Sequence, residues 1–222
     1  MPARPSSSSA SLTPDSIAEL LQPYIRATRT DPPKAATTAP DWSQIYSQLA
    51  LYLELILKWN TRINLTAIRA PQEIVRRHFG ESLFAGLHLG PCSSLLDFGS
   101  GAGLPGIPIQ LLRPDIPVTL AESRGRKAAF LREVVRALGL PTEVWAGRVE
   151  SMPHSPFDTV ALRAVDEMDA AAAEAARRAE RRLVILGTSR QMDNLPASFN
   201  IEASIPLPES STGVLLLLNR TQ

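Results

Sequence analysis

A glycine-rich stretch at residues 95–106, Leu-Leu-Asp-Phe-Gly-Ser-Gly-Ala-Gly-Leu-Pro-Gly, carries the first chemical signal in this sequence. From Gly99 the spacing is G-x-G-x-G, and from Gly101 it is the G-x-G-x-x-G of a dinucleotide-binding turn. Glycines directly after a strand let the backbone approach a ligand closely, and the next helix N-terminus offers unpaired amides. The stretch predicts an adenosine-containing cofactor, with NAD and S-adenosylmethionine as the two candidates.

Two acidic residues bear on that choice. Glu122 follows the next apolar run, where a carboxylate holds the ribose hydroxyls of either cofactor. Asp97 lies two residues before Gly99, with no basic residue until Arg113. An acid there would repel a pyrophosphate and attract the sulfonium and ammonium of S-adenosylmethionine. Asp97 therefore favours S-adenosylmethionine, with a helix-capping carboxylate as its alternative role.

The elements that must position these residues follow from the hydrophobic pattern. From residue 94, short apolar runs alternate with helical ones, which is typical of a parallel sheet covered by helices. We predict strands at 94–98, 118–122, 143–145, 158–163 and 183–186, and helices at 107–112, 126–138 and 166–182. The apolar stretches 199–203 and 214–219 predict an antiparallel terminal pair. The expected fold class is α/β: a class I methyltransferase, Rossmann-like seven-stranded mixed sheet with an N-terminal helical appendage.

Three segments are expected along the chain. Residues 1–40 comprise a low-complexity N-terminus, a short helix that Thr13 or Asp15 caps, and a linker rich in Thr, Pro and Ala. Residues 41–90 form a helical region in which Asp41 caps a longer helix. Residues 91–222 form the S-adenosylmethionine-dependent methyltransferase domain.

Composition limits the classes of partner. The 222 residues carry a formal net charge of +1, so any contact with nucleic acid must come from a local basic patch. Cys92 is the single cysteine and there are three histidines, so the sequence predicts no internal disulfide and no metal site. Neither a signal peptide nor a run long enough for a membrane span is evident, which predicts a cytoplasmic protein.

The residues around the glycine stretch resemble a known signature. Residues 96–108, Leu-Asp-Phe-Gly-Ser-Gly-Ala-Gly-Leu-Pro-Gly-Ile-Pro, are similar to that of the glucose-inhibited division protein B family, which methylates nitrogen 7 of a guanine in 16S ribosomal RNA. Further matching stretches include Trp59-Asn60, Arg77-His78 and Arg163-Ala164. The resemblance covers roughly residues 45–187. It implies S-adenosylmethionine as cofactor and 16S ribosomal RNA or the small ribosomal subunit as partner, with no membrane.

The same resemblance implies roles for individual residues. Gly99 and Leu104 would line the cofactor pocket, Val149 and Glu150 would border the adenine, and Arg163 would close the site as its catalytic residue. With the acidic and glycine positions added, the expected cofactor-binding set is Asp97, Gly99, Gly101, Gly103, Leu104, Glu122, Val149, Glu150 and Arg163. The alternatives are a surface acid at Glu150, a strand-end ion pair at Arg163 and a core position at Leu104.

Basic residues outside the glycine stretch are the candidates for RNA contact. Those between the helical region and the sheet domain are Arg62, Arg69, Arg76 and Arg77. A second group, Arg177, Arg178, Arg181 and Arg182, lies on an Ala-rich helical stretch beside Glu174 and Glu180, which predicts a solvated helix face. For His78 we favour a structural role over a reactive one.

Two departures from the family pattern leave other functions open. Leu186-Gly187 stands where the family usually has Lys-Gly, and Thr212-Gly213 stands where it usually has Arg-His. Both changes affect the side that meets RNA. A non-catalytic ribosome-binding protein with a methyltransferase fold is therefore one alternative, and an NAD-dependent oxidoreductase is the other.

Overall fold

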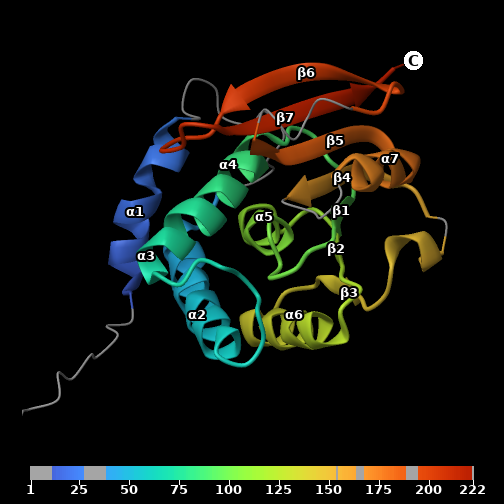
Figure 1. Cartoon of the computed structure of the whole chain (residues 1–222). Helices are drawn as coiled ribbons and strands as arrows, with labels where there is room; N and C mark the ends of the chain where they lie inside the picture. The colour runs from blue at the N-terminus through green and yellow to red at the C-terminus, as the bar shows by residue number, and fades with distance from the viewer. Residues whose placement is uncertain (1–11, 28–38, 154, 164–167, 189–194, 222) are drawn as a thin grey trace, which may run out of the picture.

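A seven-stranded mixed sheet forms the centre of the molecule (Figure 1). The computed structural model describes residues 12–27, 39–153, 155–163, 168–188 and 195–221. The strands lie in the order β3-β2-β1-β4-β5-β7-β6. The first five are parallel, and β7 pairs antiparallel with β5 and β6. Their bounds are β1 Leu95–Phe98, β2 Val118–Ala121, β3 Glu143–Trp145, β4 Phe157–Arg163, β5 Ala179–Thr188, β6 Phe199–Pro206 and β7 Gly213–Arg220. The predicted fold class is confirmed.

Helices connect the strands and precede them. Before the sheet come α1 Pro14–Arg26, α2 Trp42–Asn60, α3 Pro71–Glu73, the π-helical segment η1 Ile74–Gly80 and α4 Glu81–His88. Between strands lie α5 Gly106–Leu112, α6 Gly125–Leu138, the 3₁₀ turn η2 Val149–Ser151 and α7 Met168–Arg178. Thr13 Oγ1 accepts the N–H of Ser16 and Asp41 Oδ1 accepts the N–H of Gln44, which gives both N-terminal helices the caps expected of them.

Alternate residues of each strand pack on opposite faces of the sheet. Val184 and Leu186 pack with the buried residues of α1, α2, α4, α5 and α6, whereas Leu183 and Ile185 pack with the alanines of α7. The N-terminal helices thus share one hydrophobic core with the sheet. Gly80 permits this approach, because a Cβ there would lie 2.5 Å from the ring of Tyr24. The expected division at residue 90 stays a prediction.

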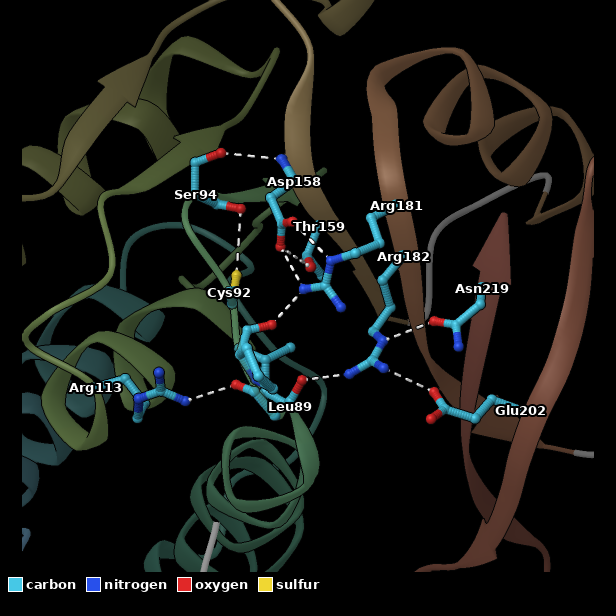
Figure 2. Close-up of polar contacts among 12 residues, drawn as sticks. Leu89, Cys92, Ser94, Arg113, Asp158, Thr159, Arg181, Arg182, Glu202 and Asn219 are labelled. Atoms are coloured by element: carbon cyan, nitrogen blue, oxygen red, sulfur yellow. Dashed lines mark hydrogen bonds and ion pairs between the residues drawn. The ribbon is translucent and has the colours of Figure 1, made fainter. Parts of the chain in front are cut away.

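The predicted helix at 166–182 is too long at its C-terminal end. Residues 164–167 lie outside the described part of the chain, α7 ends at Arg178, and β5 already begins at Ala179. Arg182 pairs with Asn219 in the β5–β7 ladder, and its guanidinium donates to Glu202, Asn219 and the Leu89 carbonyl (Figure 2). These tertiary contacts override the helical propensity of the Ala-rich run.

The basic residues of this region are consequently not one solvated face. Arg177 is exposed, but Arg178 and Arg182 are 4% and 7% exposed. Arg181 binds Asp158 and the Pro91 carbonyl, so Arg181 and Arg182 together hold the loop that leads into β1 (Figure 2). The prediction of a solvated face was wrong for these residues because their partners come from distant segments. None of the helices in the described ranges is long and apolar enough to cross a membrane.

Candidate functional site

A cavity of about 520 Å³ lies where β1, β2, β3 and β4 end. Its volume is in the range of small-molecule sites, and this edge of a parallel sheet is where such ligands bind. Seven expected cofactor-binding residues line it: Gly99, Gly101, Leu104, Glu122, Val149, Glu150 and Arg163. Several other lining residues are not in the set expected from the sequence, among them Thr66, His78, Arg124, Lys127 and Arg148.

The glycine turn and Glu122 form the floor of this cavity. Gly99 and Gly101 have φ of 68° and 58°, the left-handed backbone that favours glycine. Glu122 is 6% exposed, and its two carboxylate oxygens accept the N–H groups of Gly101 at 2.9 Å and Arg124 at 2.7 Å. Each oxygen retains a second lone pair. The carboxylate is therefore fixed in place and still able to accept hydrogen bonds from a ligand.

Asp97 does not line the cavity. Its side chain is fully buried, and Oδ2 accepts the N–H of Gly106 at 2.9 Å, at the first residue of α5. Burial raises the pKa of Asp97 to about 7, although the hydrogen bond from the N–H of Gly106 opposes this shift. The expected contact with the cofactor is corrected to the capping role. With Lys127 and Arg148 on the cavity wall, the electrostatic argument against a pyrophosphate no longer holds.

Gly103 also lies behind the cavity. Its φ is 88°, and a Cβ there would be 2.8 Å from the Tyr52 hydroxyl. Tyr52, on α2, donates to the carbonyl of Ala102 and stacks on Phe79 with ring centroids 5.0 Å apart. Gly103 thus admits the tyrosine that holds the glycine turn from below. The expected direct contact with cofactor is corrected to this packing role.

Arg163 forms the cavity wall on the β4 side. Its guanidinium makes five contacts with the helices before β1: the carbonyls of Arg77 and His78, His78 Nδ1, Ser82 Oγ and Glu81 Oε2. The distance to Glu81 is 2.7 Å and both side chains are about one-tenth exposed. Burial raises the pKa of Glu81, and the charges of Arg163 and Arg77 oppose that shift. Arg163 therefore forms an ion pair with Glu81 at the end of β4 and also borders the cavity.

His78 and Thr66 continue this wall. His78 Nε2 lies 2.7 Å from Thr66 Oγ1, and Nδ1 faces Arg163 Nη2 at 3.1 Å. Burial, together with the charges of Arg163 and Arg77, lowers the pKa of His78 to about 3. The ring is therefore neutral near pH 7 and both nitrogens are engaged. The π-helical turn η1 carries His78 and directs its ring and carbonyl toward the end of β4.

The wall on the β3 side is held by a different arginine. Arg178, at the end of α7, donates to the carbonyls of Val149, Met152 and Pro153 and to Glu174 Oε1. Val149 is 5% exposed, whereas Glu150 is exposed on the cavity rim. The loop that borders this end of the cavity is thus fastened from below. No sequence signal identified Arg178, because its carbonyl partners lie more than twenty residues away.

The four arginines proposed to contact RNA lie outside the cavity lining. Arg62 and Arg69 are exposed, and Arg69 donates to Asn60 and Asn64. Arg76 forms ion pairs with Glu73 and Glu209 at 3.4 and 3.6 Å. Arg77 is 62% exposed and lies 4.0 Å from Glu81. Their contact with RNA stays a prediction. Within the described residues no group of acidic, histidine or cysteine side chains has the geometry of a metal site.

Leu186 lies beside Arg163 in the β4–β5 register and is 1% exposed. Leu186, which stands where the family named above usually has a lysine, is therefore part of the hydrophobic core. Thr212 precedes β7, whose first residue is Gly213. Neither residue lines the cavity.

Solved structures show the same fold. Magnesium protoporphyrin IX methyltransferase from Synechocystis, with bound SAM, superposes with a TM-score of 0.55 at 13% identity, covering 77% of this chain and 97% of that one. The ribosomal protein L11 methylase from Lactobacillus delbrueckii gives 0.54 at 12% identity, over 66% of this chain and 80% of that one. At this identity the likeness establishes the class I methyltransferase fold.

Sequence comparison is more specific. The family model described as rRNA small subunit methyltransferase G matches residues 45–200. The ribosomal RNA small subunit methyltransferase G of Nitrosomonas europaea is 46% identical to this chain over the matched residues. The match covers 58% of this chain, and the chain spans 61% of that relative's length. The protein of the same name from Nitrosomonas eutropha is 37% identical over 75% of this chain and 82% of its own. The chain therefore belongs to the rRNA small subunit methyltransferase G (GidB) family.

Proposed function

We propose that this chain transfers a methyl group from S-adenosylmethionine to nitrogen 7 of a guanine in 16S ribosomal RNA. The observation that carries the proposal is the cavity at the strand ends, which Gly99, Gly101 and Glu122 line in a chain of this family. The cavity is large enough for a nucleoside cofactor together with the edge of a base.

The residues present fit S-adenosylmethionine. Glu122 is a buried carboxylate whose free lone pairs suit ribose hydroxyls. Val149 offers a buried apolar surface beside Glu122 for the adenine, and the left-handed turn at Gly99 lets the methionine part approach the backbone. When bound, the cofactor supplies an electrophilic methyl group on a sulfonium.

The chemistry asks little of general acids or bases. Nitrogen 7 of guanine has an in-plane lone pair and no proton, so it can attack the methyl group without prior deprotonation. The state of His78 is consistent with a reaction that needs no base, because its ring is neutral and both ring nitrogens are engaged in hydrogen bonds. Catalysis then rests on holding the base and the cofactor in line within a preorganised site.

Arg163 has a positioning role in this proposal. Its five contacts to the chain join the end of β4 to η1 and α4, so it holds His78 against the cavity and does not itself move a proton. For the RNA, the exposed Arg62, Arg69 and Arg77 supply positive charge away from the cavity, and Arg148 supplies it at the rim. Each is proposed as a phosphate contact.

The substrate has to expose the nitrogen 7 edge. In A-form RNA that edge faces a deep and narrow groove, so the enzyme is expected to act on a loop or on an assembling small subunit. The experiment is incubation of the protein and labelled S-adenosylmethionine with undermethylated small subunits and with naked 16S ribosomal RNA. Label in 7-methylguanosine after nuclease digestion supports the proposal.

Two outcomes would contradict this function. Saturable binding of NAD without binding of S-adenosylmethionine would indicate the oxidoreductase. Tight binding of S-adenosylmethionine and of small subunits with no methyl transfer would indicate a non-catalytic ribosome-binding protein, which the buried Leu186 in place of the usual lysine makes worth testing.

A further inference from the structure

The hydrogen bonds between Arg163, His78 and Thr66 have a fixed direction. A guanidinium has only donors, so His78 Nδ1, 3.1 Å from Arg163 Nη2, must accept. A neutral imidazole that accepts at Nδ1 carries its proton on Nε2. Nε2–H therefore donates to Thr66 Oγ1 across 2.7 Å.

The hydrogen of the Thr66 hydroxyl is the part of this group that remains available to a ligand. Its oxygen also accepts the N–H of Ile68 at 3.1 Å, which fills both acceptor sites of a hydroxyl. Its own hydrogen can only donate, and the described residues provide no acceptor for it, while Thr66 lines the cavity. Asn60 holds the backbone of Thr66 at both its N–H and its carbonyl. Thr66 thus presents to the cavity a donor that cannot turn into an acceptor.

The location of this donor matches the reacting end of the site. Thr66, His78 and Arg163 lie toward β4, whereas Glu122 and the Val149 loop lie toward β2 and β3. With the ribose at Glu122 and the adenine at Val149, the methionine part of the cofactor extends toward β4. The target base has to approach from that end.

We propose that the Thr66 hydroxyl reads O6 of the target guanine and thereby selects guanine over adenine. Both purines offer nitrogen 7 as an acceptor, but guanine adds an O6 acceptor beside it where adenine has an N6 donor. A freely rotating hydroxyl would tolerate either base, so selection requires its direction to be fixed. Arg163, acting through His78, fixes it. This inference rests on the proposed function.

The test compares Thr66→Val, which removes the hydroxyl at nearly constant shape, with Thr66→Ser, which retains it. A matched control is Thr61→Val, since Thr61 is exposed on the same segment and donates to the Lys58 carbonyl outside the cavity. For each variant we measure the melting temperature, the Kd for S-adenosylmethionine by calorimetry, and kcat/KM on undermethylated small subunits. The target position is first mapped with the wild-type protein, and subunits are then reconstituted with adenine in its place.

We expect Thr66→Val to lower kcat/KM on guanine roughly tenfold, with an unchanged Kd for S-adenosylmethionine, and to narrow the preference for guanine over adenine. Thr66→Ser, which retains the hydroxyl, should retain the preference for guanine, and Thr61→Val should behave as wild type. An unchanged preference in a folded Thr66→Val protein would overturn the inference while wild-type activity upholds the proposed function. A weakened Kd with an unchanged preference would assign the donor to the cofactor and overturn it as well. Were Thr66→Val not to fold, a loss of preference in Thr66→Ser would overturn it. An inactive wild-type protein would overturn the proposed function itself.

Discussion

Each wall of the cavity is held by one arginine, the buried Arg178 on the β3 side and the largely buried Arg163 on the β4 side, but the two walls present different groups to a ligand. On the β3 side, Arg178 donates to three carbonyls of a loop and remains behind it. On the β4 side, Arg163 borders the cavity and acts through a histidine on a hydroxyl. The first wall is a fastened loop that presents Val149 between the charged side chains of Arg148 and Glu150. The second wall is a series of hydrogen-bonded polar side chains whose donor direction is fixed.

This difference indicates that the β3 side binds the cofactor and the β4 side binds the target base. A fixed loop beside the Glu122 carboxylate suits a cofactor that is the same in every turnover. A directed donor suits a base that has to be distinguished from other bases. If the walls are separate in this way, variants on the β3 side should change cofactor affinity and variants on the β4 side should change transfer.

The largest effect is expected from Arg163→Ala. It leaves Glu81 buried without its 2.7 Å partner and removes the tie between β4, η1 and α4. We expect the free energy of unfolding to fall by about 3–5 kcal/mol and methyl transfer to be lost. Arg163→Lys should restore little, because a point charge cannot replace the planar fork. Denaturant unfolding and initial rates measure both quantities, and a stable, fully active Arg163→Ala protein would remove the residue from the wall.

Arg178→Ala should affect the opposite wall. It removes the guanidinium donor from the carbonyls of Val149, Met152 and Pro153 and from Glu174 Oε1, whereas Glu174 Oε2 keeps its bond from Arg177. We expect a loss of about 2–3 kcal/mol in stability and a raised Kd for S-adenosylmethionine in the folded protein. Arg177→Ala is the matched control, since Arg177 binds the same glutamate but is 68% exposed, and its loss should cost roughly 0.5 kcal/mol or less. Equal cofactor affinity in the two variants would contradict the role of Arg178.

A smaller effect concerns pH. His78 has its pKa lowered to about 3 in the folded protein, below the ordinary 6.5, so the unfolded chain binds more protons between these values. Its contribution to stability is present above pH 6.5 and is lost as the pH falls toward 3. Between pH 7 and 5 the wild-type protein should therefore lose on the order of 1–2 kcal/mol more than His78→Gln.

The difference in stability between the wild-type protein and His78→Gln reports the titration of His78 alone. Asp97 has a raised pKa of about 7, so its contribution is present at low pH and lost as the pH rises, which is the opposite direction. That term is common to both proteins and cancels in their difference. Parallel pH profiles of stability would contradict the lowered pKa of His78, because they would show that His78 takes up protons equally in the folded and unfolded states.

The strand pattern and the glycine turn were predictable because both are local. Apolar runs bounded by turn residues located all seven strands, and the spacing of the glycines located the floor of the cavity. The exact end of α7 was not predictable, because the ladder partner and the side-chain acceptors of Arg182 lie far away in the sequence. Local propensity then competes with contacts that a linear pattern does not contain.

The polar residues of the site show the same contrast between local patterns, which were predictable, and long-range contacts, which were not. Glu122 was placed by its distance from the glycine turn, and the cavity includes it. Asp97 was assigned by its charge alone, but its neighbour in space is the first amide of α5. The chain from Arg163 through His78 to Thr66 joins residues up to 97 positions apart, and its direction depends on donors and acceptors that only the folded structure brings together.

Glu122 and its surroundings are proposed to bind S-adenosylmethionine, and the β4 wall is proposed to bind the target base. Calorimetric titration of S-adenosylmethionine into the wild-type protein, Glu122→Ala and Thr66→Val separates these two roles. Loss of hydrogen bonds to a charged acceptor should weaken binding to Glu122→Ala by about 1.5–3 kcal/mol, and Thr66→Val should bind as the wild-type protein does. Unchanged affinity in a folded Glu122→Ala protein would show that Glu122 does not bind the cofactor.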